Sequence, residues 1–246
     1  MINTVAIIQA RTSSTRLPNK VFADLCGKPL IWHVFDRIQS SRFINSFVLA
    51  TTNNELDNSL VDWAKDNDTL YFRGDEKNVL KRYYDAAKCY KADIIVRITS
   101  DDPFKDIDII DNVISLLINN KLDFAFNNKP PTFPEGMDVE VFTFDALEKA
   151  YLQCNDDFEK EHVTQFFHKN VKLFNVKNFS YKENLSNYRW TIDTKLDLEM
   201  TRLVYNKIYN VNKAFNMNDI LNLFVNHPDI PLMNQFVERS QMYKQF

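Results

Sequence analysis

The chain has 246 residues, of which 45% are hydrophobic and 26% are charged, a balance typical of folded proteins and not of disordered chains. Lys and Arg number 30 against 33 Asp and Glu, and the net charge of −3 argues against nucleic acid as a partner. The apolar runs are too short to span a membrane, and the first residues do not form a signal-peptide pattern, so we expect no membrane association. Three widely spaced cysteines predict reduced thiols and a cytoplasmic protein.

Short apolar runs alternate with helical patterns along the first half of the chain. The run at 5–8 predicts a parallel strand that is buried on both faces. Further strands are predicted at 47–50, 70–72, 94–98 and 122–126. Helices are predicted between them at 29–39, from 55 onward, at 78–90 and at 107–119. This repetition favours the α/β class with a doubly wound, mostly parallel sheet.

Three prolines within 130–134 interrupt the repetition, because proline is excluded from regular helices and central strands. After them, polar and apolar residues alternate at 138–142, which predicts a half-exposed strand. The elements predicted next are helices at 145–153 and 158–169, a strand near 174–176 and a strand at 188–192, and the remainder is largely helical. We therefore predict a single domain over 1–246, with a protruding arm at about 128–188.

A basic loop at 9–20 follows the first predicted strand directly. Its cations Arg11, Arg16 and Lys20 flank four consecutive hydroxyl residues. Such a loop lies at the edge where open α/β sheets bind ligands, and guanidinium and ammonium groups suit phosphate oxygens. A solvated polar turn is the alternative, and spacing alone supports both equally. The loop is neither a Walker A motif nor a GxGxxG fingerprint.

Two carboxylates are expected at the same edge of the sheet. Asp101 follows the strand predicted at 94–98, and Asp193 follows the strand predicted at 188–192. Oxygen ligands there suit Mg²⁺, which commonly takes one or two carboxylates together with phosphate oxygens. The alternatives are a turn at Asp102 and a helix cap at Asp193.

Arg189 lies four residues before Asp193, on the same face of the predicted strand. Its guanidinium fork would match the carboxylate of an acidic acceptor. A structural ion pair is equally supported. Arg82 is expected to be a solvated charge on an amphipathic helix, with a phosphate contact as the alternative.

Six ordered segments carry a family resemblance. RTSSTRLPNK at 11–20, with GKPL at 27–30, resembles the RxGSTRLPxK…GKPL opening of the cytidylyltransferases that activate acidic sugars, including the KDO and acylneuraminate synthetases. The SpsF-type branch of spore-coat polysaccharide biosynthesis is the most similar. The resemblance continues in RGD with VLKRYY at 73–84, RITSDDP at 97–103, GMDVEVF at 136–142, EHVT at 161–164 and RWTID at 189–193. Ser13 replaces the usual glycine, and its side chain would narrow the loop or change its backbone angle.

The resemblance implies a Rossmann-like three-layer α/β/α nucleotidyltransferase fold, a homodimer joined by the arm, and CMP transfer from CTP to a small acidic acceptor for surface polysaccharide or glycoconjugate biosynthesis. The residues that it places at the nucleotide are Ala10, Arg11, Ser14, Lys20, Arg73, Asn78 and Ser100. The expected catalytic residues are Arg11, Arg16, Lys20 and Asp101. The expected metal ligands, for Mg²⁺, are Asp101 and Asp193. The expected acceptor-binding residues are Glu140, His162 and Arg189.

Purely structural roles are the alternative for some of these residues. Asn78 could be a helix N-cap, His162 could stabilise the arm, and Asp197 is expected in the first turn of a helix. Two other functions also remain. A GT-A glycosyltransferase would present similar aspartates, although a sugar diphosphate needs fewer cations than the basic loop supplies. A non-catalytic nucleotide-binding protein is suggested by Ser13 alone.

Overall fold

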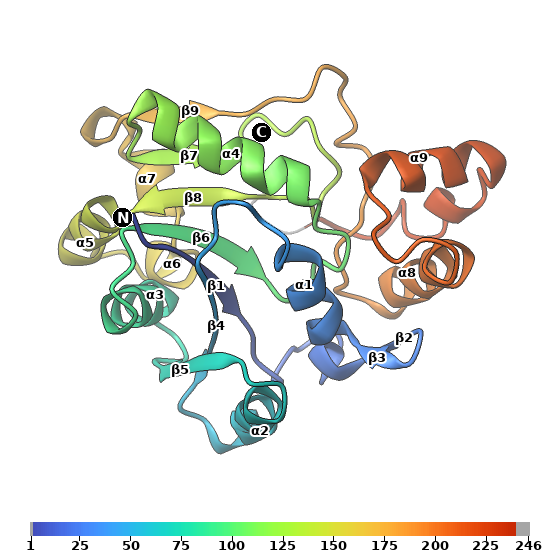
Figure 1. Cartoon of the computed structure of the whole chain (residues 1–246), viewed down its shortest axis with the longest axis horizontal. Helices are drawn as coiled ribbons and strands as arrows, with labels where there is room; N and C mark the ends of the chain where they lie inside the picture. Colours follow the sequence, from blue (N-terminus) through green and yellow to red (C-terminus); the bar gives the residue numbers. More distant parts are fainter. Residues whose placement is uncertain (1, 240–246) are drawn as a thin grey trace.

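One seven-stranded sheet organises the computed structural model of the chain, which describes residues 2–239 (Figure 1). Its order is β5-β4-β1-β6-β8-β7-β9, and only β8 runs antiparallel to its neighbours. The strands are β1 (Thr4–Gln9), β4 (Ser46–Thr52), β5 (Leu70–Gly74), β6 (Ile94–Thr99), β7 (Phe124–Phe126), β8 (Glu140–Thr143) and β9 (Val176–Asn178). A short hairpin is formed by β2 (Asp24–Leu25) and β3 (Lys28–Pro29).

Helices cover both faces of this sheet, as the α/β prediction requires. They are α1 (Leu30–Ile38), α2 (Asn58–Asp66), α3 (Val79–Cys89), α4 (Ile107–Asn120), α5 (Phe144–Gln153), α6 (Asp157–Glu161), α7 (Gln165–Lys169), α8 (Lys195–Ile208) and α9 (Met217–Asn226). Short 3₁₀ turns are η1 (Lys20–Phe22), η2 (Glu55–Asp57), η3 (Val171–Leu173) and η4 (Ile230–Leu232). No helix within residues 2–239 is long and apolar enough to cross a membrane.

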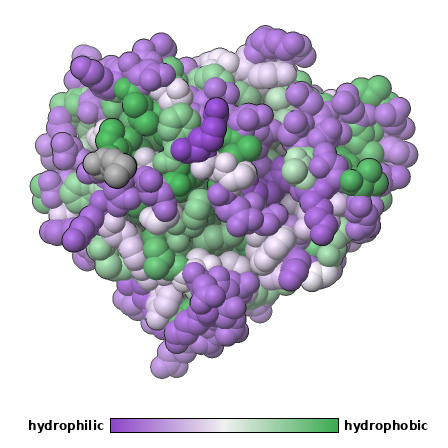
Figure 2. All heavy atoms as spheres, in the orientation of Figure 1, coloured by the Kyte–Doolittle hydropathy of each residue, from purple (hydrophilic) through white to green (hydrophobic). Residues whose placement is uncertain are grey.

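Alternate residues of β1 explain the layers. Ala6 and Ile8 pack with α1, α4 and α8, whereas Val5 and Ile7 pack with α3 and α5. Because both faces of the strand are buried, its sequence is a continuous apolar run. Hydrophilic residues surround smaller apolar patches on the face drawn in Figure 2.

The strand order creates a switch point between β1 and β6. The chain passes from β1 outward to β4 and β5, then returns to pair β6 with the other side of β1. The loops that follow β1 and β6 therefore diverge at the carboxyl edge, which is where open α/β sheets hold ligands. The basic loop and Asp101 occupy these two loops.

The structure corrects the predictions for the segment at 128–188. Most of this segment is not an arm, because it contributes β8, β9 and α5–α7 to the body of the fold (Figure 1). The strand predicted as half exposed is buried between β6 and β7. Its polar residue Glu140 is not solvated but faces Arg97 across the β6–β8 pair, a partner that alternation along one strand cannot show.

Two further elements differ from the predictions. The helix expected at 158–169 is divided into α6 and α7, because Val163 adopts a left-handed backbone with φ of 50°. No strand forms at 188–192, where the segment makes one isolated bridge within residues 2–239, between Arg189 and Glu135. Strand alternation therefore does not govern the direction of the side chains there.

Candidate active site

A cavity of about 350 Å³ lies at the carboxyl edge of the sheet, between the loops after β1 and β6. The predicted site residues that line it are Ala10, Arg11, Ser14, Arg16, Lys20, Ser100, Asp101, His162 and Asp193. Four other predicted site residues are not among its lining residues: Arg73, Asn78, Glu140 and Arg189. The segment around the first strand and the segment before α8 are thus brought together, although they lie far apart in the sequence.

The basic loop is held in shape by Thr12. The Thr12 backbone N–H and hydroxyl both donate to Asp57 Oδ1, each at 2.8 Å, and the Asn19 N–H donates to the Thr12 carbonyl at 3.0 Å. Ser13 does not have the left-handed backbone that would favour glycine, and it is not among the residues lining the cavity. The serine at this position therefore does not narrow the cavity.

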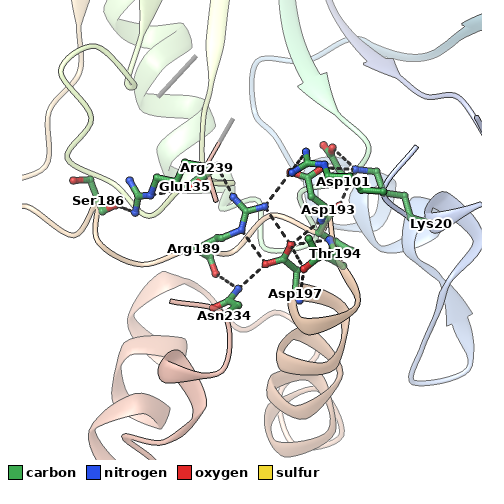
Figure 3. Close-up of polar contacts among 12 residues, drawn as sticks. Lys20, Asp101, Glu135, Ser186, Arg189, Asp193, Thr194, Asp197, Asn234 and Arg239 are labelled. Carbon is green, nitrogen blue, oxygen red and sulfur yellow. Dashed lines mark hydrogen bonds and ion pairs between the residues drawn. The ribbon is translucent and has the colours of Figure 1, made fainter. Parts of the chain in front are cut away.

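Lys20 joins the two predicted metal ligands. Its ammonium group donates to Asp101 Oδ2 at 2.7 Å and to Asp193 Oδ1 at 2.9 Å (Figure 3). A third bond reaches the Ile192 carbonyl at 2.8 Å. An ammonium group has three N–H donors, so the protein itself uses all of them. Lys20 therefore holds the carboxylates together in this structure and does not present a free donor to the cavity.

Asp193 receives three cations. Arg16 Nη2 lies 2.9 Å and Arg189 Nη2 lies 3.0 Å from Asp193 Oδ2, while Lys20 binds the other oxygen. Burial opposes ionisation of this carboxyl group, but the charges of Lys20, Arg16 and Arg189 outweigh it and hold its pKa below the ordinary value. Asp193 is therefore a carboxylate at neutral pH.

Arg189 is enclosed by carboxylates. Its guanidinium group donates to Glu135 at 2.8 Å, to Asp197 at 2.9 and 3.2 Å, and to Asp193 at 3.0 Å (Figure 3). Only 4% of the residue is exposed. The structure thus shows the structural ion pair and contradicts the prediction that Arg189 points into the cavity toward an acceptor. Its role is to position Asp193.

Asp197 lies in the first turn of α8, as predicted. It closes a capping box with Thr194, and Asn234 Nδ2 donates to its Oδ1 at 2.9 Å. The N-cap of α8 is Thr194 and not Asp193, so Asp193 keeps its oxygens for the cations around it.

Glu140 lies beneath the cavity and does not line it, which contradicts the prediction that it contacts the acceptor. Arg97 Nη1 binds Glu140 Oε2, and the Thr164 hydroxyl donates to Oε1 at 2.8 Å. Burial disfavours the charged form, but Arg97 and His168 outweigh it and lower the pKa of Glu140 to about 2. The carboxylate fixes Arg97, which does line the cavity.

This depressed pKa predicts an acid-dependent loss of stability. A carboxyl group with a folded pKa of about 2 and a usual value of 4.5 contributes its full stabilisation above pH 4.5 and loses it as the pH falls toward 2. Two to three pKa units correspond to roughly 3 kcal/mol. Glu140→Gln should therefore lower the free energy of unfolding at pH 7 and flatten its decline between pH 4.5 and 2. Urea unfolding at a series of pH values measures both effects, and equally steep declines for variant and wild type would contradict the assignment.

Arg73 and Asn78 organise the loops beside the cavity. Arg73 donates to the carbonyl groups of Thr52 and Asn54 at 2.8 and 2.7 Å. Asn78 is the N-cap of α3, where its side chain accepts from the Lys81 N–H at 2.8 Å. Both side chains are already committed to backbone partners, so the structure favours local roles over direct nucleotide contacts.

His162 lines the cavity and packs on Phe158, with 4.3 Å between ring centroids. Burial lowers the pKa of its imidazole, and the nearby charge of Arg97 lowers it further, while Glu161 opposes the shift. The ring is therefore neutral at pH 7 and offers one donor and one acceptor to a ligand.

Comparisons with known proteins decide the family. The family model described as cytidylyltransferase matches residues 5–234. The chain belongs to the cytidylyltransferase family. It is 32% identical to a cytidylyltransferase structure from Leptospira borgpetersenii serovar Hardjo-bovis, with a TM-score of 0.91 over 97% of this chain and 100% of that one.

Two curated relatives support the same family. The spore coat polysaccharide biosynthesis protein SpsF of Bacillus subtilis is 32% identical over 208 residues, 82% of this chain and 85% of that protein. The 3-deoxy-manno-octulosonate cytidylyltransferase of Brucella ovis is 35% identical over 128 residues, half of each chain. These findings confirm the predicted family, fold and enzyme class, and the chain is a CTP-dependent nucleotidyltransferase.

The cytidylyltransferase site has a donor set that fits Mg²⁺. Asp101 and Asp193 are hard oxygen donors, and their shared contacts with Lys20 show that they converge on one point. Within residues 2–239, no three His, Cys, Asp or Glu side chains form a metal-binding cluster. An ion held by these two carboxylates would therefore need phosphate oxygens or water to complete its coordination, which is common for Mg²⁺.

Gly136 lets the cavity wall approach the segment before Asp193. Its φ is +102°, and a Cβ atom there would lie 2.7 Å from the Thr191 backbone nitrogen. Gly136→Ala should therefore lower the free energy of unfolding, by about 1–3 kcal/mol from backbone strain alone, and should displace the segment that carries Asp193. Calorimetric unfolding checks the first effect and CTP affinity the second. Gly27→Ala is the control, because its φ is also positive but no atom lies within 4 Å of the added carbon; equal effects for both variants would contradict the steric argument.

Among the polar residues that line the cavity, the sequence did not assign Gln9, Arg97 or Asn128 to a site, and it gave Arg82 a phosphate contact only as the alternative. A signal was present for Gln9 and Arg97, since polar residues at the carboxyl ends of otherwise apolar strands are exceptions to the burial pattern. Arg82 gave no such signal, because an arginine on a helix is ordinarily exposed. In the structure only 3% of Arg82 is exposed, so the prediction of a solvated charge is wrong.

Proposed function

We propose that this cytidylyltransferase transfers CMP from CTP to a hydroxyl group of an acidic sugar or a related small acid. The acceptor oxygen attacks the α-phosphorus, the bond from that phosphorus to the bridging oxygen of the β-phosphate breaks, pyrophosphate leaves, and the hydroxyl proton passes to solvent. The observation that carries the proposal is the convergence of Asp101, Asp193 and the basic loop on one cavity.

The basic residues of the cavity would bind the phosphates, and its carboxylates would bind the metal ion. Arg11 makes no ion pair with any residue in 2–239 and lines the cavity, so its guanidinium group is available to the triphosphate. Arg16 is 47% exposed and can move from Asp193 to a phosphate oxygen. Mg²⁺ held by Asp101 and Asp193 would supply charge neutralisation at the phosphates. Positioning and electrostatics account for the rate, and no nucleophilic side chain is required.

The acid class of the acceptor rests on two supports. The relative from Brucella ovis is named for a sugar acid, and arginines line the cavity beyond the basic loop. The relative from Bacillus subtilis is named for polysaccharide synthesis, which fits a role in making a surface polysaccharide or glycoconjugate. The working form we propose is a homodimer.

A pyrophosphate-release screen tests the function. CTP, ATP, GTP and UTP are each incubated with Mg²⁺ and a panel of acidic and neutral sugars. We expect release with CTP and an acidic sugar, and none when either is omitted. Release with a neutral sugar but not with its acidic counterpart would contradict the acid class, and a preference for another nucleotide would contradict the base.

A further inference from the structure

Arg82 is a buried cation that contacts no carboxylate among the described residues. Only 3% of the residue is exposed, and it makes no ion pair with any residue between 2 and 239. Among the residues that the structure describes, its side chain makes one hydrogen bond, from Nη1 to the Asp75 carbonyl at 2.9 Å, and its Nε has no partner. Burying a charge without compensation costs several kcal/mol. The structure nevertheless buries this arginine at the wall of the cavity.

The electrostatic surroundings of Arg82 also leave its charge poorly compensated. Burial lowers the pKa of its guanidinium group, and the charge of Arg11 lowers it further, while Tyr83, Asp57 and Asp75 oppose the shift. Two cations therefore stand near each other at one end of the cavity. The chain also keeps space for the Arg82 stem. Gly74 does not have a positive φ, but a Cβ atom on it would lie 2.9 Å from Arg82 Cγ.

Two more unpartnered polar atoms lie on the same side of the sheet. Gln9 and Arg97 occupy the α3 face, because Gln9 follows the buried positions Val5 and Ile7 at even spacing, and Arg97 is paired in register with Ile7. Both line the cavity, and the buried atoms Gln9 Oε1 and Arg97 Nε have no hydrogen-bond partner in the described part of the chain. Buried polar atoms are normally satisfied. The Nε–H groups of Arg82 and Arg97 and the Oε1 atom of Gln9 are therefore available to a ligand.

We infer that Arg82, with Arg97 and Gln9, forms a buried oxyanion subsite of the cytidylyltransferase cavity. The guanidinium Nε–H groups of Arg82 and Arg97 bind a carboxylate or phosphate, and Gln9 Oε1 accepts a hydrogen bond from a hydroxyl or amino group beside it. The ligand class is a small oxyanion that carries such a neighbouring donor. Within the proposed function, on which this inference rests, the oxyanion is either the acidic group of the acceptor or part of the triphosphate.

Anion binding to purified protein tests the subsite without a known acceptor. Inorganic pyrophosphate and D-gluconate, a carboxylate with neighbouring hydroxyl groups, are titrated by calorimetry in metal-free buffer. Arg82→Met should weaken at least one of the two by about tenfold or more. Arg82→Lys keeps the charge but loses the fork, so the affinity of the same anion should fall less than in Arg82→Met. Unchanged affinities in both variants, or a wild type that binds neither anion, would overturn the inference.

A matched control separates the subsite from a general loss of an arginine. Arg202 donates to the Asp24 carbonyl at 3.0 Å from an exposed position on α8, the same type of bond that Arg82 makes. Arg202→Met should leave both affinities within about twofold of wild type. A melting temperature for each variant shows that it folds. Without ligand, Arg82→Met should melt no lower than wild type because it removes an uncompensated buried charge, whereas a purely structural arginine would leave a less stable protein with normal anion affinity.

Nucleotide titrations then identify the source of the oxyanion. If Arg82 binds the triphosphate, Arg82→Met lowers the affinity for CTP and leaves the affinity for CMP unchanged. If Arg82 binds the acceptor, Arg82→Met lowers the affinity for gluconate and leaves the affinities for CTP and CMP unchanged. The proposed function can fail separately: a wild type that shows Arg82-dependent anion binding but no pyrophosphate release with any acid keeps the subsite and loses the function. A wild type that turns over, with Arg82→Met equal to it in both assays, keeps the function and loses the subsite.

Discussion

Asp101→Asn and Asp193→Asn should each reduce CMP transfer by a factor of about a hundred to a thousand, the loss typical of removing one group that stabilises transition-state charge. Each substitution keeps the shape of the side chain but removes a negative charge from the point on which Lys20 converges. Turnover with CTP at saturating Mg²⁺ measures the loss.

A second aspartate provides the control for that experiment. Asp111 is buried and bound by Ser41 and Arg42, away from the cavity, so Asp111→Asn also removes a buried, ion-paired carboxylate. It should affect stability but not the rate per folded molecule. If Asp101→Asn or Asp193→Asn retains wild-type turnover, the two carboxylates do not act in the reaction.

Lys20→Ala should convert the carboxylate pair into a site that binds divalent cations without nucleotide. In the structure the ammonium group occupies the point between Asp101 and Asp193, and its removal leaves two partly buried like charges facing each other. We expect Mn²⁺ affinity, measured by electron paramagnetic resonance, to rise by about tenfold or more relative to wild type. Without metal the variant should lose about 3 kcal/mol of stability, the magnitude typical of breaking a buried pair.

Arg16→Ala is the matched comparison for Lys20. Arg16 binds the same carboxylate, Asp193, but from an exposed position, so its removal should change Mn²⁺ affinity and stability much less. CMP transfer should fall in both variants. Mn²⁺ affinity that rises equally in Arg16→Ala and Lys20→Ala, or in neither, would contradict the view that Lys20 acts as the resident cation of the carboxylate pair.

The sequence was sufficient for the parts of this molecule that are local or periodic. The buried strand at 5–8, the basic loop after it and the position of Asp101 follow from apolar runs and their ends. The family resemblance favoured a metal-binding role for Asp193, which no local pattern distinguishes from a helix cap. These residues do line one cavity, because parallel strands place their carboxyl ends on one edge.

Partners that are distant in the sequence could not be predicted in the same way. Arg189 and Glu140 were assigned to an acceptor because each is a charged residue inside a family motif. Their actual partners, Asp197 with Glu135 for Arg189, and Arg97 for Glu140, become neighbours only through folding. The prediction that Arg82 is a solvated charge was wrong for a related reason, because helical periodicity does not reveal that α3 lies against a polar cavity.

The bonds that Asn234 makes extend the support of Asp193 to the segment after α9. Asn234 Nδ2 donates to the Arg189 carbonyl at 3.0 Å and to Asp197 Oδ1 at 2.9 Å (Figure 3), so Asn234 braces the two residues that hold Asp193 in place. The geometry around Asp193 therefore depends on a segment that lies beyond α9 and does not itself line the cavity.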